Sequence, residues 1–145
     1  MASRRDDNLV EEIARECIAN KIRLLNRAVT ALYDQALRPY GLTIGQMSVL
    51  VTLSKMGGAS PVSLGRVLHM EKCTLSRNVQ RMRARGWLEA IPTEDRRTSE
   101  LRASDRGLRL LRDVHPAWNR AQQRARAMLG GHGLRGIVRS VARLA

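Results

Sequence analysis

The chain has 145 residues, 43% of them hydrophobic and 27% charged, a composition typical of one globular domain and not of a disordered chain. Phe is absent while helix formers such as Leu, Ala, Arg and Met are abundant, so we expect a mainly α-helical fold and exclude an all-β one. The formal net charge of +13 favours a polyanionic partner, because bound phosphates release their counterions. The largest excess falls in residues 108–145, which hold eight basic residues and one acidic residue.

The sequence also bears on the compartment in which the protein works. No apolar segment of the signal-peptide type follows the polar residues 1–8, and no run approaches the ~18 apolar residues of a membrane span. Cys17 and Cys73 are too few for a disulfide framework, which agrees with a reducing environment. We therefore expect a cytoplasmic protein with no membrane partner.

Residues 9–37 predict one long N-terminal helix. Apolar side chains recur there at spacings of three and four, and a second stripe begins at Ile13 and Cys17. Pro39 and Gly41 end the helix. The main stripe consists of Ile18, Ile22, Leu25, Val29, Leu32 and Ala36. A stripe this wide indicates burial against more than one partner.

Two shorter helices are predicted next. Thr43 caps one that runs to about Met56, where residues 57–58 are both Gly and stop it. Residues 60–62 are expected to be extended, and Ser63 then caps a short third helix. The side chains expected to face inward are Ile44, Met47, Leu50, Val51 and Leu53 in the first of these helices and Leu64, Val67 and Leu68 in the second.

A fourth helix and a hairpin follow. The helix is expected over residues 71–85, with Gly86 as its left-handed C-terminal cap. Its buried face consists of Leu75, Val79 and Met82. Residues 87–91 alternate like a strand, residues 93–97 form a charged turn, and residues 98–103 return as the partner strand.

The C-terminal part predicts two more helices. Ser104 caps a long one that runs to about Leu129 and is kinked by Pro116. The Gly-rich residues 130–133 break it, and residues 134–144 form a final amphipathic helix. The apolar stripes are Leu108, Leu111, Trp118, Ala121, Ala125 and Met128, then Leu134, Ile137, Val138, Val141 and Leu144.

Two helices joined by a tight turn and followed by a basic hairpin are the order of a winged helix-turn-helix. On a wheel of about 100° per residue, the side of the fourth helix opposite Leu75 carries small and polar residues. Arg can grip guanine and Gln adenine, while small residues near the N-terminus let a helix enter the major groove. The candidate DNA contacts are Lys72, Cys73, Thr74, Ser76, Arg77, Gln80 and Arg81, with Arg77 the first candidate for a base. The alternative is an ordinary solvated face.

The hairpin turn adds a second candidate contact. Arg96 and Arg97 lie at its tip, which is narrow enough to enter a minor groove, where the negative potential attracts Arg. Asp95 fits an ion-pair partner that holds one of them in place. The alternative is a charged turn that serves only solubility.

Residues 95–107 resemble the wing signature of the MarR family (multiple antibiotic resistance regulators), which is Asp-x-Arg, a strand, and then Leu-Thr-x-x-Gly. The matching positions are Asp95, Arg97, Ser104 and Gly107, whereas Ala103 stands where the family usually has Leu. Residues 63–88 also resemble the family's reading unit, and residues 41–46 its second-helix entry.

The resemblance implies a homodimer on double-stranded DNA. Residues 1–42 would form an N-terminal dimerisation helix, residues 43–104 the winged helix-turn-helix, and residues 105–145 the C-terminal dimerisation helices. The fourth helix of each copy would lie in a major groove and the Arg97 wing in the flanking minor groove. The operator would be an inverted repeat with half-sites about 10–10.5 bp apart.

The family also implies a small aromatic or phenolic effector bound between the two parts, which releases the DNA. The candidate lining is Cys17, Tyr33, Tyr40 and Trp118, although Tyr33 and Trp118 also fit core or interface positions. A redox-responsive regulator using Cys17 with Tyr33 is an alternative, but Cys17 lies two positions early and Ile44 replaces a second helper Tyr. Oxidation of Cys73 would add bulk at the DNA face. The alternative is that Cys73 is only a small residue there, with no redox role.

Other functional classes fit less well. The three His residues are isolated, no His/Cys/Asp set has metal-ligand spacing and no Gly-rich phosphate loop follows a strand, so we expect no enzyme, cofactor or metal. An RNA-binding protein usually has stacking aromatics, and only 3% of this chain is aromatic. A nucleoid-type protein without sequence preference remains a further alternative.

Overall fold

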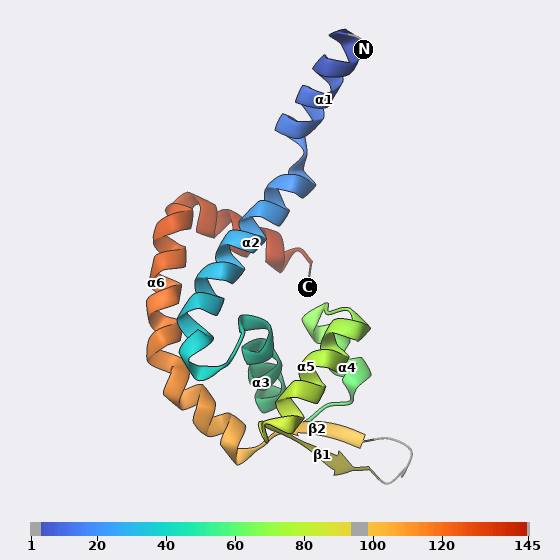
Figure 1. Cartoon of the computed structure of the whole chain (residues 1–145), viewed down its shortest axis with the longest axis vertical. Helices are drawn as coiled ribbons and strands as arrows, with labels where there is room; N and C mark the ends of the chain where they lie inside the picture. The colour runs from blue at the N-terminus through green and yellow to red at the C-terminus, as the bar shows by residue number, and fades with distance from the viewer. Residues whose placement is uncertain (1–3, 94–98, 145) are drawn as a thin grey trace.

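The structure is a computed structural model that describes residues 4–93 and 99–144 (Figure 1). In chain order these residues form α1 (Arg4–Glu16), α2 (Ile18–Leu37), the 3-10 helix η1 (Arg38–Tyr40), α3 (Ile44–Met56), α4 (Pro61–Leu68), α5 (Lys72–Ala84), β1 (Leu88–Pro92), β2 (Ser99–Ala103) and α6 (Asp105–Ala142). The predicted fold class, mainly helical with one hairpin, is confirmed. None of these helices is both long and apolar enough to cross a membrane.

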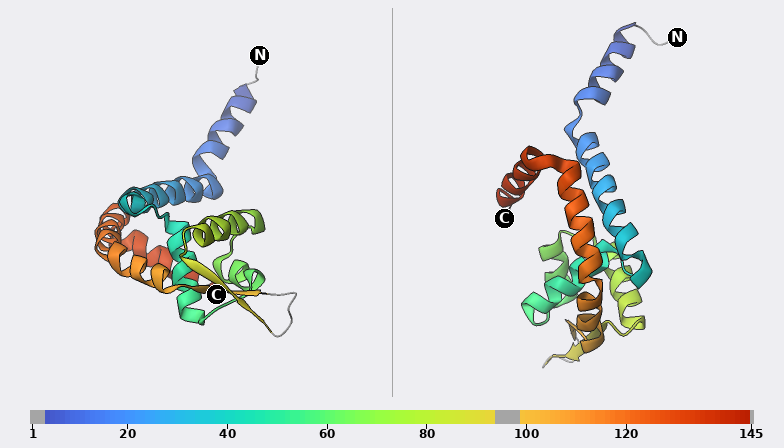
Figure 2. Two further views of the ribbon diagram at one scale, coloured as in Figure 1. Left: turned by 60° about the horizontal axis from the view of Figure 1, so that its bottom comes forward. Right: turned by 90° about the vertical axis from the view of Figure 1, so that its left-hand side faces the viewer.

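The described elements form two parts, called here the scaffold (α1, α2 and α6) and the reading head (α3, α4, α5 and the hairpin). In the scaffold, α2 packs side by side with α6, and α1 projects away from the rest of the chain (Figures 1 and 2). In the head, α3 lies between α6 and α5 (Figure 1).

The N-terminal prediction of one continuous helix is wrong, because the chain breaks at Cys17. That residue has φ −59° and ψ 106°, while its N–H still donates to the Ile13 carbonyl at 3.0 Å and its carbonyl accepts from Lys21 at 3.2 Å. The break therefore costs few hydrogen bonds, and water satisfies the remaining exposed groups. Leu9, Val10 and Ile13 are all more than half exposed, so no other described residue packs against these side chains to keep α1 in line with α2.

The boundary between α2 and α3 follows the local signals. Pro39 lies in η1, and Gly41 adopts the left-handed conformation at φ 67°. Thr43 caps α3 by accepting from the Gln46 backbone N–H, while the Gln46 side chain accepts from the Thr43 N–H. This reciprocal capping box satisfies two donors that the helix itself leaves free.

The prediction for α4 was wrong at its start. The helix begins at Pro61 and is capped by Ser60, whose Oγ accepts from the Ser63 N–H at 3.2 Å. Pro is favourable at the first helical position, because its missing N–H has no partner there in any case. The predicted inward positions Val67 and Val51 are 55% and 39% exposed, because the described part of the chain does not cover the sides of α4 and α3 that carry them.

One main core holds the head to the scaffold. Leu37 of α2, Leu50 of α3, Leu64 of α4, Met82 of α5 and Val114 of α6 are fully buried in it. A second, smaller cluster lies between α2 and α6 and consists of Tyr33, Ala121 and Ala125, with Trp118 packed against both clusters.

The start of α6 is tied closely to the hairpin. β1 and β2 pair antiparallel, with Leu88 opposite Ala103. Ser104 caps α6 by accepting from the Gly107 N–H at 3.0 Å. A Cβ on Gly107 would lie 2.4 Å from the Trp87 carbonyl oxygen, so this approach requires glycine.

The C-terminal helices follow the prediction in part. The backbone dihedrals of α6 stay helical through Pro116, and the helix changes direction along this stretch (Figure 1). The expected break over four residues is a turn at one of them, Gly130, with φ 65° and ψ 167°. The helix resumes immediately and continues to Ala142.

Candidate DNA-binding surface

The outward face of α5 is polar along its whole length. The buried side chains are Leu75 and Met82, with Val79 half-buried between them. Because these three recur at helical spacing, they orient the opposite face to solvent. All the residues predicted to contact DNA are exposed there, namely Lys72, Cys73, Thr74, Ser76, Arg77, Gln80 and Arg81.

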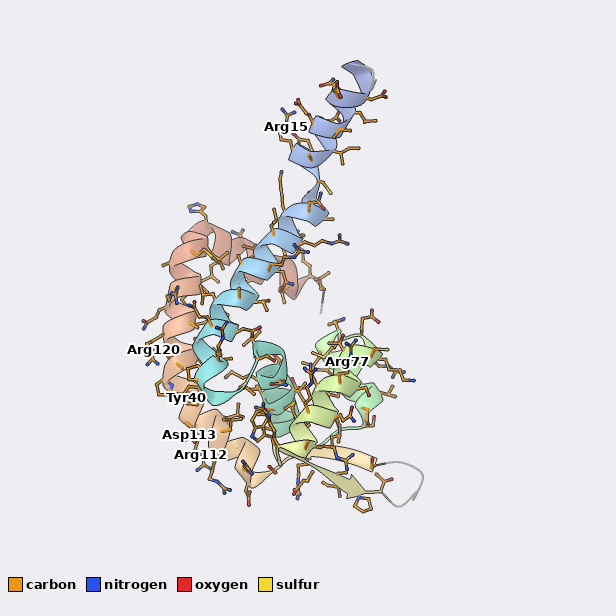
Figure 3. The ribbon with its side chains drawn as sticks, in the orientation of Figure 1. Arg15, Tyr40, Arg77, Arg112, Asp113 and Arg120 are labelled. Atoms are coloured by element: carbon orange, nitrogen blue, oxygen red, sulfur yellow. The ribbon has the colours of Figure 1, made fainter. Side chains whose placement is uncertain are left out.

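Arg77 is placed as the sequence predicts. It lies on the side of the molecule opposite Arg112 and Arg120 of α6 (Figure 3). Its Nε donates to the Cys73 carbonyl at 3.3 Å, a long and exposed hydrogen bond that leaves the terminal guanidinium nitrogens available. In the part of the chain that the structure describes, the ion pairs are Arg15 with Glu16 and Arg102 with Glu89. No carboxylate there therefore neutralises the cations of α5.

The turn that sets α5 against α4 is tight. His69 adopts the left-handed conformation at φ 47°, and the Met70 N–H donates to the Gly65 carbonyl at 3.1 Å. A Cβ on Gly65 would lie 3.4 Å from a methyl group of Leu75, so the small residue permits the close approach of the two helices. This is the helix-turn-helix geometry that the order of elements predicts.

The C-terminal end of α5 is fixed by contacts that sequence reasoning missed. The Arg85 guanidinium donates to the Gly41 carbonyl at 2.6 Å and lies 4.9 Å from the centre of the Trp87 ring. Gly86 has φ 71°, as expected of the cap, and its carbonyl accepts from the Ser104 hydroxyl at 2.6 Å. These contacts join the end of α5 to the loop before α3 and to the start of α6.

A large open hollow of about 1470 Å³ lies between α4, α5 and β1, beside the outward face of α5. Among the residues that line it are Ser76 and Gln80, which were predicted, and Arg66 and Arg83, which were not. The signal for Arg66 and Arg83 was only that each is basic and lies within the helix-turn-helix. Both are exposed and add positive charge next to the predicted base contacts.

The wing is described only in its strands. Arg102 of β2 holds Glu89 of β1 through Nε at 3.0 Å and a terminal nitrogen at 2.6 Å, which links the two strands. The predicted tip residues Asp95, Arg96 and Arg97 lie outside the described residues. Their minor-groove contact stays a prediction.

The four predicted effector residues lie in different surroundings. Tyr33 is buried between α2 and α6, where its hydroxyl donates to Gln122. Burial raises the pKa of Tyr33, and the positive charge of Arg126 lowers it by less, so the phenol is neutral at physiological pH. Trp118 packs near Tyr33 and stacks on His115, with 5.9 Å between the ring centres. Cys17 lies half-buried at the break between α1 and α2.

Tyr40 lies apart from these three. It lines a hollow of about 500 Å³ together with Arg85 and Trp87, and none of the other three predicted residues lines it. The structure therefore places two of the four, Tyr33 and Trp118, in one apolar cluster and does not collect the set in this hollow. The effector site stays a prediction. No group of His, Cys, Asp or Glu within the described ranges could hold a metal ion.

Comparison with known proteins agrees with this geometry. Residues 40–98 match the family model described as "MarR family". The multiple antibiotic resistance protein MarR of Salmonella typhimurium is 27% identical over 95 residues, 65% of this chain and 66% of that protein. The transcriptional regulator PecS of Dickeya dadantii is 30% identical over 95 residues, 63% of this chain and 55% of that protein. The matches thus span about two thirds of MarR and just over half of PecS.

Solved structures share the fold over most of the chain. The M. tuberculosis transcriptional regulator MosR, in complex with DNA, is 29% identical with a TM-score of 0.77, covering 89% of this chain and 93% of that one. An E. coli MarR mutant complexed with operator DNA has a TM-score of 0.80 at 20% identity, covering 92% and 96%.

The structure has a two-stranded wing beside a helix-turn-helix, and the outer face of α5 is polar and without carboxylate partners in the described ranges. These features define a DNA-binding transcriptional regulator of the winged-helix class. Within that class the chain is similar to the MarR family, whose model matches residues 40–98.

Proposed function

We propose that this protein represses transcription as a homodimer that reads an inverted-repeat operator with one α5 helix per half-site. The observation that carries the proposal is the exposed face of α5, on which Arg77, Gln80 and their neighbours have no carboxylate partner within the described ranges. Arg and Gln at these positions suit base edges, and Lys72 and Thr74 suit bases or phosphates. A dimer bound across a promoter would block access by polymerase, without any catalytic step.

The dimer is supported by apolar surface that one copy cannot cover. Side chains at both ends of the chain are more than half exposed, including Leu9, Ile13, Ile18, Ile22, Val138 and Val141. Exposed apolar patches of this extent mark interaction surfaces, and a two-fold dimer uses the same patch on each copy. We assign dimerisation to the exposed apolar side chains of residues 1–42 and 105–145, and DNA reading to residues 43–104.

Effector control belongs to the same proposal. DNA binding by Bordetella bronchiseptica BpsR, a structural neighbour at 22% identity and a TM-score of 0.79, is regulated by 6-hydroxynicotinic acid. A small molecule that binds one spacing of the two heads better than another would shift the dimer away from DNA. Cys17, Tyr33, Tyr40 and Trp118 are the first residues to test for such binding. We place this activity in the cytoplasm.

Selection of bound duplexes from a random pool at ~150 mM salt tests the core of the proposal. The expected result is an inverted repeat whose half-sites lie about one helical turn apart. Enrichment of no motif would support a non-specific binder, and preferential binding of structured RNA would move the protein to another class. A panel of aromatic acids and phenols, added after selection, then tests effector release. Oxidation by an organic peroxide, with Cys17→Ser as control, tests the redox alternative.

A further inference from the structure

The outer side of α6 carries four arginines that the reading function does not use. Arg109, Arg112, Arg120 and Arg124, here called the arginine row, are all exposed. At about 100° per residue they fall within roughly a third of the helix circumference. The buried residues Val114, Ala117, Ala121 and Ala125 occupy the adjoining arc of the helix, next to Arg124, and face α2 and the core. Arg112 and Arg120 point away from the body of the protein, on the side opposite Arg77 (Figure 3).

The arginine row forms no ion pair within the described ranges, although Asp113 lines the same small hollow as Arg109. No ion pair or hydrogen bond joins any of its side chains to another described residue. Asp113 is the single acidic residue in residues 108–145. Arg120 and Arg124 are four positions apart, a like-charge spacing that destabilises a helix. The row therefore contributes nothing to folding that would explain it.

The surroundings of the arginine row favour a phosphate backbone over a protein surface. Stable protein interfaces need an apolar or aromatic centre, and no large apolar side chain is exposed between Arg109 and Arg124. The row extends over fifteen residue steps, about 22 Å at 1.5 Å each. That length spans about six phosphate steps of a duplex at roughly 3.4 Å per step.

We infer that the arginine row binds a second segment of double-stranded DNA, without sequence preference, on the side of the protein away from the operator. This goes beyond the proposed function, in which only α5 and the wing contact DNA. A dimer would present two such rows. It could then hold the operator on one side and a distant or neighbouring duplex on the other, bridging the two.

The test is capture of a second duplex by a protein that is already bound to its operator. Operator duplex is immobilised and saturated with protein, and a labelled duplex lacking the operator is added at ~100 mM salt. The row variant is R109Q/R112Q/R120Q/R124Q. The matched control, R15Q/R38Q/K55Q/R139Q, removes the same charge from exposed positions scattered outside the row.

The parent and the control should capture the second duplex, and the row variant should lose at least tenfold. Operator affinity should stay within about twofold, and the mass should stay that of the dimer, in all three proteins. If four phosphates are contacted, the slope of log affinity against log salt concentration for capture should also be shallower in the row variant by about 3–4.

Several outcomes would overturn the inference. One is failure of the parent to capture any second duplex, and another is capture by the row variant equal to that by the parent. An equal loss in the control would assign the effect to net charge alone. A parallel loss of operator affinity would place the arginines on the same duplex, and a halved mass would place them at a subunit contact. Displacement by polyglutamate as effective as by duplex DNA would identify an acidic protein as the partner.

Discussion

The reading head and the terminal helices differ in how completely the chain buries their apolar side chains. In the head, α3, α4, α5 and the hairpin close over one core whose central side chains, such as Leu50, Leu53 and Met82, are fully buried. In α1, in the first half of α2 and near the end of α6, apolar side chains of the same kind are exposed. The head is thus complete as one copy, whereas the ends need a second surface. We therefore expect DNA binding and the proposed dimer assembly to be separable by mutation.

The largest effect should come from the core of the head. Leu53→Ala removes a fully buried side chain from α3 and should lower the free energy of unfolding by about 2–5 kcal/mol, because a cavity remains. Chemical denaturation measures this. The matched control is Val67→Ala on α4, which is 55% exposed and should change stability by about 0.5 kcal/mol or less. Equal losses in both variants would mean that the core boundary is wrongly drawn.

A smaller effect, on assembly and not on folding of the head, should follow from Ile22→Ser. Ile22 is 59% exposed in one copy, so its burial of about 1.5–3 kcal/mol is gained only in the dimer. Dimer dissociation should become at least roughly tenfold easier by sedimentation analysis. Val62→Ser on α4, also an exposed apolar position, should leave the mass unchanged. An unaltered dimer in the Ile22 variant would move the interface elsewhere.

On the DNA side, Arg77→Ala should weaken binding to the selected operator by about 1–3 kcal/mol and relax preference at one base pair. Fluorescence anisotropy with single-base operator variants measures both effects. Arg15→Ala carries the same charge change on α1, where Arg15 pairs only with its neighbour Glu16, and should bind like the parent. Uniform weakening on all sequences would make Arg77 a phosphate contact instead.

The smallest predicted effect concerns the joint between head and scaffold. Ser104→Ala removes the cap of α6 and the hydroxyl donor to the Gly86 carbonyl, so stability should fall by about 1 kcal/mol. Ser54→Ala removes a hydroxyl that only bonds back to the Leu50 carbonyl of its own helix and should cost less. Thermal unfolding of both variants separates the two roles, and a larger loss at Ser54 would contradict this reading of the joint.

Local signals in the sequence predicted much of the fold. Thr43 and Ser104 cap their helices and Gly86 takes the left-handed conformation, because each depends on hydrogen bonds and sterics within a few residues. The spacing of Leu75 and Met82 correctly predicted which face of α5 is outward, and the candidate DNA contacts of α5 are exposed there. The cap of α4 was misassigned because Ser60 and Ser63 both precede the apolar run, and the Pro61 position decides between them.

By itself, then, the sequence determined the order of elements, the polar face of α5 and the resemblance to the MarR family, since periodicity, caps and the wing motif are encoded over short stretches. Only the tertiary structure decided the break at Cys17, the exposure of Val51 and Val67, and the anchoring of Arg85 on Gly41. Each depends on what another part of the chain does or fails to do at that position. Arg85 and Gly41 are 44 residues apart, and no local pattern connects them.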